Sequence, residues 1–114
     1  MEASEIAHRA AIIASNKQAG DILILDIRDA SSFTDFFVLC SGNSERQIDM
    51  TKEEIIKSLK DSGVLPHHEE GTPPSGWLVL DYGSVVVHIF TPEKRRYYQL
   101  EKIWQNASTM LTIQ

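Results

Sequence analysis

The turn Ser41-Gly42-Asn43-Ser44 lies between an apolar run and a helical pattern, where free backbone amides could bind a phosphate group. Enzymes that transfer nucleotides open their active sites with such a turn, and they hold Mg²⁺ on neighbouring carboxylates. Asp26 and Asp29 are three residues apart near a predicted strand end, and Asp81 has no acidic residue two positions later. Because the carboxylate pair is missing, the pattern favours a structural turn, whose geometry also needs glycine and asparagine.

The other reactive side chains predict no catalytic or metal site. The consecutive residues 67–70, His-His-Glu-Glu, cannot easily converge on one ion, since recognised metal sites leave about two to four residues between ligands. A solvated loop is therefore favoured there. Cys40, the single cysteine, sits in an apolar run, which predicts a buried and inert thiol. We expect no catalytic residue, no metal and no cofactor, and we expect His8 to be a surface residue.

The segment from Trp77 to Trp104 concentrates side chains that suit recognition. Arg95, Arg96, Tyr97 and Tyr98 follow one another within a single turn. Arginine and tyrosine combine a large contact area with polar tips, as binding surfaces require. The aromatic residues at 97, 98 and 104 cannot all lie on one helical face, so some of them are exposed and available to a partner.

His88 belongs to a predicted strand and shares one face with Val86 and Phe90, because side chains alternate along a strand. The opposite face is wholly aliphatic and belongs in the core, through Val85, Val87 and Ile89. The face with His88 could be a semi-exposed contact surface. A histidine satisfied within the sheet is an equally good interpretation.

The elements that position these residues follow from periodicity and turn signals. We predict a helix over 4–18, buried strands over 21–26 and 36–40, a helix from the capping box Ser44–Gln47 to Gly63, a loop over 63–76, hairpin strands over 77–81 and 85–90, and a helix from 92 to about 105 with Thr91 as N-cap. Residues 106–114 are polar enough to fray. The pattern predicts one α/β domain, 1–114, with a small mixed sheet of about four to five strands flanked by helices. The unit from Phe36 to Val79 would cross over right-handedly if its strands are parallel.

Composition narrows the classes of partner. The 114 residues include 16 acidic and 11 basic side chains, for a formal net charge of −5. An acidic chain repels phosphate and suits a basic protein, so direct sequence-specific binding of nucleic acid is not expected. The chain shows no signal peptide and no membrane-spanning run, which with one cysteine predicts a cytoplasmic protein.

Two motifs closely resemble the ribosome-silencing factor family, also called Iojap-like: FTDFFVLCSGNSERQ at 33–47 and WLVLDYGSVVVHIFTPEKRRYYQLEKIW at 77–104. With the connecting helix and the Glu70-Gly71 pair, the resemblance covers nearly the whole chain. It implies a nucleotidyltransferase-like fold without that activity. It also implies binding to the large ribosomal subunit through large-subunit ribosomal protein fourteen, which blocks joining of the small subunit and lowers translation in nutrient shortage.

Nine positions characteristic of the family are expected, from the chemistry of their side chains, to touch or shape the partner surface: Trp77, Asp81, Tyr82, His88, Phe90, Glu93, Arg95, Tyr97 and Tyr98. The family usually has an aspartate where this chain has Ser84, which would remove one contact at the rim of an interface and leave binding intact. Two alternatives stay open, a large-subunit assembly factor and a nucleotidyltransferase-like enzyme. An aromatic face that waits for a partner also leaves open a homodimer of the free protein.

Overall fold

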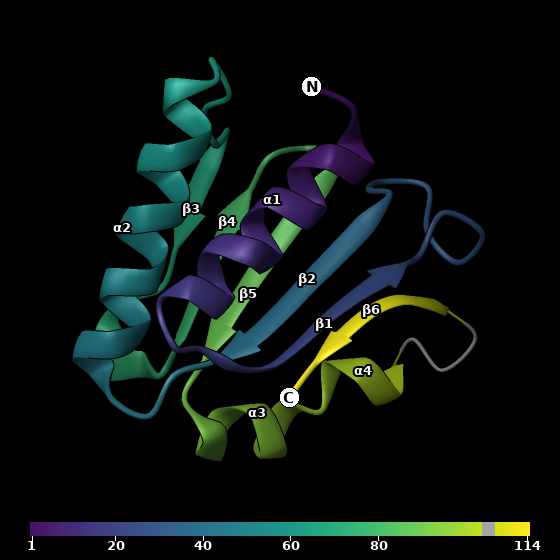
Figure 1. Cartoon of the computed structure of the whole chain (residues 1–114). Coiled ribbons are helices and arrows are strands. Elements are labelled where there is room, and N and C mark those ends of the chain that lie inside the picture. The colour runs from purple at the N-terminus through teal and green to yellow at the C-terminus, as the bar shows by residue number, and fades with distance from the viewer. Residues whose placement is uncertain (104–106) are drawn as a thin grey trace.

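A computed structural model describes residues 1–103 and 107–114 and has one six-stranded sheet in the order β3-β4-β5-β2-β1-β6 (Figure 1). The strands are β1 (Gly20–Asp26), β2 (Phe36–Ser41), β3 (His68–Glu70), β4 (Trp77–Asp81), β5 (Val85–Phe90) and β6 (Ser108–Ile113). The helices are α1 (Ala3–Asn16), α2 (Glu45–Asp61), a single 3₁₀ turn η1 (Pro73–Ser75), α3 (Pro92–Tyr98) and α4 (Leu100–Ile103). The sheet is mixed, because β2 and β5 are parallel and the other neighbouring pairs are antiparallel.

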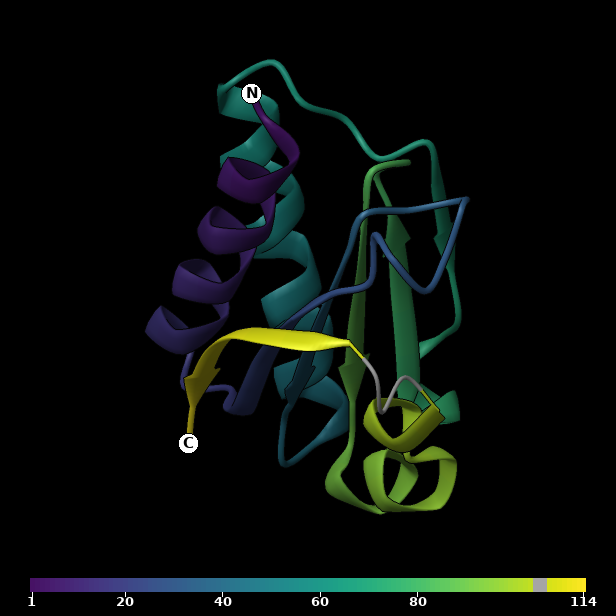
Figure 2. The same ribbon diagram turned by 90° about the vertical axis from the view of Figure 1, so that its right-hand side faces the viewer.

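Helices α1 and α2 pack side by side on one face of the sheet (Figure 2). Helix α1 comes close to the strands because its inward face carries small residues, and Ala7, Ala10 and Ala14 are fully buried. Helix α2 adds Ile48, Ile55 and Leu59, which follow the period of a helix and are also fully buried. The predicted aliphatic face of β5 lies in this core, as expected.

A second cluster of buried residues lies on the opposite face of the sheet, away from α1 and α2. It joins Phe37, Leu39 and Phe90 to neighbours from β1 and β5, with Trp77 and Leu100 packed against it. Phe90 is fully buried and His88 is only 7% exposed. The interpretation of this face as a semi-exposed contact surface was therefore wrong for these two residues, because Trp77 and the segment after β5 cover them.

Strand pairing corrected the sequence prediction at both edges of the sheet. Residues 106–114 were expected to fray, but Ser108–Ile113 forms β6 and pairs with β1. Leu111 and Ile113 pack against the helix-covered core, so alternate residues hold the strand in place. The loop 63–76 contains the short strand β3, paired with β4. Six strands therefore replace the four to five expected.

Two connections also differ from prediction. Strand β2 is parallel to β5, whereas β4 is antiparallel to β5, so β2 and β4 run in opposite directions. The right-handed crossover from Phe36 to Val79 was predicted only for parallel strands, and that condition is not met. The helix expected from 92 to about 105 breaks at Gln99, which takes the left-handed conformation with φ of 49°. Its predicted end and Trp104 lie outside the described residues. Thr91 is the N-cap of α3 and Pro92 opens it, as predicted.

Candidate protein-docking surface

Aromatic rings form a continuous row from α3 to the interior of the sheet. The ring of Tyr98 lies 4.5 Å from that of Trp77, and the Trp77 ring lies 5.1 Å from that of Phe90. Tyr97 meets Tyr98 edge-on at 5.0 Å. Exposure rises along the row: Phe90 is fully buried, Trp77 is half-buried, Tyr98 is 41% exposed and Tyr97 is 77% exposed. The exposed rings are thus held by packing against fixed ones, which lowers the entropy that a partner must overcome.

His88 positions the indole of Trp77 from below. The Trp77 Nε1–H donates to His88 Nδ1 at 3.2 Å, so that nitrogen must be unprotonated. The imidazole also meets the Phe37 ring edge-on at 4.8 Å. Burial lowers the pKa of His88 from 6.5 to about 4, because the charged form is poorly solvated there. His88 therefore supports the surface and stays neutral near pH 7.

Arg95 ties three elements together. Its Nε donates to Glu101 Oε2 at 2.9 Å and its Nη1 donates to Ser41 Oγ at 3.0 Å, which joins α3 to α4 and to the end of β2. The Arg95 side chain is only 10% exposed. It was expected to touch or shape the partner surface. Its contacts favour shaping, since they set the position of α3 and of the tyrosines that follow.

Asp81 and Tyr82 build the hairpin turn. The carboxylate of Asp81 accepts a hydrogen bond of 2.7 Å from the Gly83 N–H, and Gly83 has φ of 84°, which favours glycine. Tyr82 is 5% exposed and belongs to the helix-covered core. Burial raises the pKa of Tyr82 to about 12. Both residues therefore hold the hairpin in shape.

We define a candidate surface, called the docking surface below, as Trp77, Val79, Tyr97 and Tyr98 with the neighbouring acidic residue Glu70. Val79 is half-buried on β4, and Glu70 lies directly opposite it on the exposed edge strand β3. Sequence reasoning did not select Val79 or assign a role to Glu70. The alternation of β4 would have found Val79, because Leu78 and Leu80 are buried and Trp77 and Val79 share the other face. Glu93 is exposed at the start of α3.

The turn Ser41–Ser44 uses its own amides internally. The Gly42 N–H donates to the Phe90 carbonyl at 2.8 Å, and the Asn43 N–H donates to the side chain of Gln47 at 2.7 Å. Ser44 is the N-cap of α2 and accepts from the Gln47 N–H at 3.0 Å. The N-cap role of Ser44 is confirmed, but the reciprocal bond of a capping box is not formed, because the Gln47 side chain accepts from the Asn43 N–H and not from that of Ser44. The amides of Gly42 and Asn43 are therefore already paired within the protein.

The remaining reactive side chains are placed as follows. Cys40 is fully buried, and burial raises the pKa of its thiol to about 12, so the prediction of a buried and inert thiol is confirmed. His8 is exposed, as predicted. Within the described part of the chain, His, Cys, Asp and Glu side chains form no group that could hold a metal ion. Among the same residues, no helix is long and apolar enough to cross a membrane.

The whole chain, residues 1–114, matches the protein family described as "Ribosomal silencing factor during starvation". The chain belongs to this family. A ribosomal silencing factor of Bacillus subtilis is 37% identical over 107 residues, which cover 94% of this chain and 91% of that protein. The chloroplastic protein Iojap of Zea mays is 37% identical over 98 residues, but these span only 41% of that longer protein. The resemblance found in the two sequence motifs is confirmed.

The fold of this silencing-factor family member matches solved structures over most of its length. The crystal structure of a Chromobacterium violaceum protein superposes with a TM-score of 0.88 at 31% identity, covering 92% of this chain and 88% of that one. A crystal structure from Bacillus halodurans gives a TM-score of 0.82 at 33% identity, covering 95% and 98%. The mixed sheet with its helices is thus the arrangement of the family.

Proposed function

We propose that this protein represses translation by binding the large ribosomal subunit and blocking its union with the small subunit. The single observation that carries the proposal is the match of the entire chain to the silencing-factor family. The names of its relatives describe a regulatory role at the ribosome. Steric blocking needs a rigid docking surface and no reactive group, so we infer that the protein is not an enzyme.

The partner is large-subunit ribosomal protein fourteen, contacted through the docking surface. Trp77 and the two tyrosines supply apolar area that a partner would cover. Glu70 on the edge strand and Glu93 on α3 are exposed acids near this area, in a chain of net charge −5. Apolar anchors with acids at the rim complement a basic protein. The action takes place in the cytoplasm.

An assembly role is the second candidate. The mouse protein "Mitochondrial assembly of ribosomal large subunit protein 1" is 34% identical over 91 residues, covering 77% of this chain. The same docking surface would serve either role, because both begin with binding to the large subunit. Depletion of the protein distinguishes the two roles. Accumulated precursors of the large subunit would favour the assembly role. Normal subunits with an increased fraction of joined ribosomes would favour the repressor role.

A nucleotidyltransferase-like enzyme is the weakest candidate, although we infer a shared ancestry of the fold. The amides of Gly42 and Asn43 are paired within the protein, so two amides of the turn are not available to a triphosphate. Incubation with Mg²⁺ and labelled nucleotides tests this candidate. Transfer that disappears on replacing Asp26 or Asp81 would restore it.

Sedimentation of purified subunits tests the leading proposal. Added protein should sediment with the large subunit and reduce the yield of joined ribosomes. Tyr98→Ala should weaken binding by at least about thirtyfold, which corresponds to the roughly 2 kcal/mol lost at an interface anchor. Met50→Ala is the control, since Met50 is 49% exposed on α2 and lies on the other side of the sheet. Undiminished joining without co-sedimentation would refute the proposal.

A further inference from the structure

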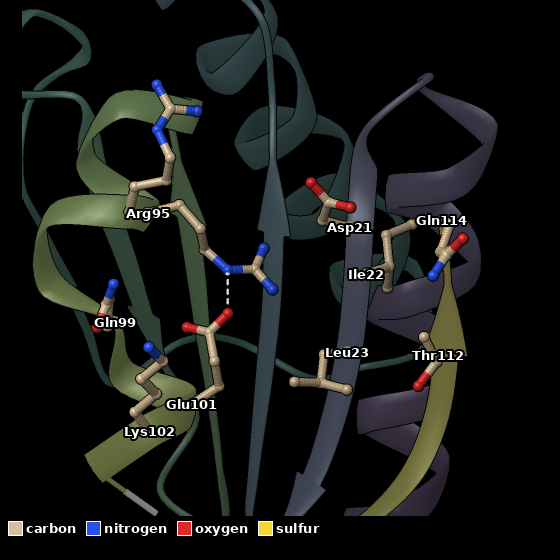
Figure 3. A pocket seen from close by; sticks show the side chains of 10 residues that line it. Asp21, Ile22, Leu23, Arg95, Gln99, Glu101, Lys102, Thr112 and Gln114 are labelled. Carbon is tan, nitrogen blue, oxygen red and sulfur yellow. Dashed lines mark hydrogen bonds and ion pairs between the residues drawn. The ribbon is translucent and has the colours of Figure 1, made fainter.

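A pocket of about 390 Å³ lies between the α3–α4 segment and the paired strands β1 and β6, apart from the docking surface (Figure 3). Its volume is in the range of sites that hold small molecules. Leu23 of β1 and Thr112 of β6 form one wall, and Arg95, Gln99 and Lys102 stand on the other. The sequence predicted no small-molecule ligand for any of these residues. Arg95 was expected only to contact or shape a protein interface.

Arg95 presents a fixed guanidinium to this pocket. Its Nε and Nη1 are held by Glu101 and Ser41, so the orientation is set before any ligand arrives. Figure 3 shows the guanidinium pointing from α3 toward Asp21 and Leu23 across the pocket. Nη2 takes part in neither of these hydrogen bonds. A planar guanidinium held in this way is suited to a carboxylate or phosphate group.

The charge of the pocket is opposite to that of the molecule. Its lining carries the cations Arg95, Arg96 and Lys102 against the acids Asp21 and Glu101, a balance of +1 in a chain of −5. Glu101 is already paired with Arg95. Arg96 and Lys102 are exposed, and the described structure shows no ion pair for either of them. A small anion would therefore be attracted to this pocket, although the net charge of the molecule repels it.

Two residues that line the pocket have a backbone conformation that is unfavourable for residues other than glycine. Asp21 has φ of 47° and Gln99 has φ of 49°, a region in which glycine is the favoured residue. Gln99 also follows α3 at the position where helices usually end with glycine. Both side chains offer oxygen atoms that can accept hydrogen bonds. Two polar residues with strained backbones that line the same pocket indicate a functional role for their side chains there.

We propose that this pocket binds a small organic anion that carries hydrogen-bond donors. The carboxylate or phosphate of the ligand pairs with the open side of Arg95 and with Arg96 and Lys102. Its hydroxyl or amino groups donate to Asp21 and to the Gln99 side chain, and Leu23 contacts its carbon skeleton. The proposal does not depend on the ribosomal role, because none of the docking-surface residues lines the pocket.

Titration of the full chain followed by amide NMR tests the site. Glycerol 3-phosphate and citrate are the phosphate and carboxylate probes, and methyl phosphate is a phosphate without donors. We expect saturable shifts in residues 21–23, 95–102 and 111–113 with glycerol 3-phosphate or citrate, and weaker binding of methyl phosphate. The absence of saturable shifts there with both donor-bearing probes below about 10 mM would overturn the proposal. Equal binding of methyl phosphate would overturn the role of the donors.

Matched variants separate a built site from general charge attraction. Arg96→Gln and Lys102→Gln should each weaken the probe by at least about fivefold, a typical loss for one charge-assisted contact. Lys94→Gln makes the same charge change on α3, but Lys94 does not line this pocket, so binding should be unchanged. If Lys94→Gln weakens binding as much as Arg96→Gln, the pocket is not the site.

Gln99→Gly provides the sharpest test. Glycine fits the positive φ at this position, so the midpoint of thermal unfolding should stay equal or rise. The same change removes a hydrogen bond to the ligand. The affinity for the probe should therefore fall at least threefold, which corresponds to about 0.7 kcal/mol. Unchanged binding in a folded Gln99→Gly variant would show that the strained side chain does not serve the ligand.

Discussion

His88 packs against Trp77 and is only 7% exposed, and its Nδ1 accepts a hydrogen bond from the indole N–H. Its Nε2 has no hydrogen-bond partner within residues 1–103 and 107–114, so the second ring nitrogen is buried at a cost. A partner can use the exposed edge of Trp77 only if the indole keeps its orientation. At the scale of single residues, the docking surface therefore depends on a histidine that a partner cannot reach.

The free energy of unfolding should fall as the pH is lowered from about 6.5 to about 4. In this range His88 binds a proton in the unfolded chain but not in the folded one. The folded pKa is lowered to about 4, so the folded state stays neutral while the unfolded state is protonated below about pH 6.5. Between these values the free energy of unfolding should drop by up to roughly 3 kcal/mol. Urea denaturation at pH 7, 5.5 and 4.5 measures the slope.

His88→Asn removes the titrating ring and should flatten that slope, whatever its effect on stability at pH 7. His8→Gln is the control, because His8 is exposed on α1 and should leave the slope as it is. An unchanged slope in the His88→Asn variant would contradict the assignment.

Gln47 connects elements that are far apart in the sequence. Its side-chain amide donates to the carbonyls of Lys17 and Gln18, at 3.3 Å and 3.0 Å, and its oxygen accepts from Asn43. The end of α1 is thereby joined to the start of α2. Gln18 has φ of 68°, so this connection also supports a strained residue before β1. At the scale of elements, one side chain thus links the C-terminal end of α1 to the N-terminal end of α2.

Gln47→Leu should lower the free energy of unfolding by about 1–3 kcal/mol, since it leaves three backbone groups without partners. Arg46→Leu is a suitable comparison, because Arg46 lies in the same turn of α2 and is exposed. It should change stability by less than about 0.5 kcal/mol. Equal losses in the two variants, measured by urea denaturation, would show that the amide bridge contributes nothing.

Charge is unevenly distributed over the elements of the molecule. The segment of α3 and α4 has four basic side chains against the two acids Glu93 and Glu101, whereas the exposed edge strand β3 carries Glu69 and Glu70. Exposed charges at the rim of an interface change the rate of association more than the rate of dissociation. The acidic edge is therefore expected to guide the protein to a basic partner, and the apolar rings are expected to hold it there.

The double variant Glu69→Gln, Glu70→Gln should slow association with the large subunit by several-fold at low salt and leave dissociation nearly unchanged. Glu53→Gln, Glu54→Gln on α2 removes the same charge from the helical side and should have little effect. Surface plasmon resonance at two salt concentrations measures both rates. A faster dissociation with unchanged association would place the two acids inside the interface instead of at its rim.

The family and most of the secondary structure could be predicted from the sequence. The capping signals at Ser44 and Thr91, the alternation of β5 and the Gly83 turn depend on neighbouring residues, and local geometry was enough to interpret them. The edge strands could not be found in this way. Residues 68–70 and 108–113 become strands only because β4 and β1 offer them backbone partners.

The amino-acid sequence by itself was enough to recognise an α/β member of the silencing-factor family, and it predicted Trp77, Tyr97 and Tyr98 as recognition residues. Only the tertiary structure decided which predicted contacts are exposed. Phe90, His88 and Arg95 became buried supports because strands and helices from distant parts of the chain cover them. Burial depends on what packs on top of a residue, and a sequence pattern specifies only the side on which the residue lies.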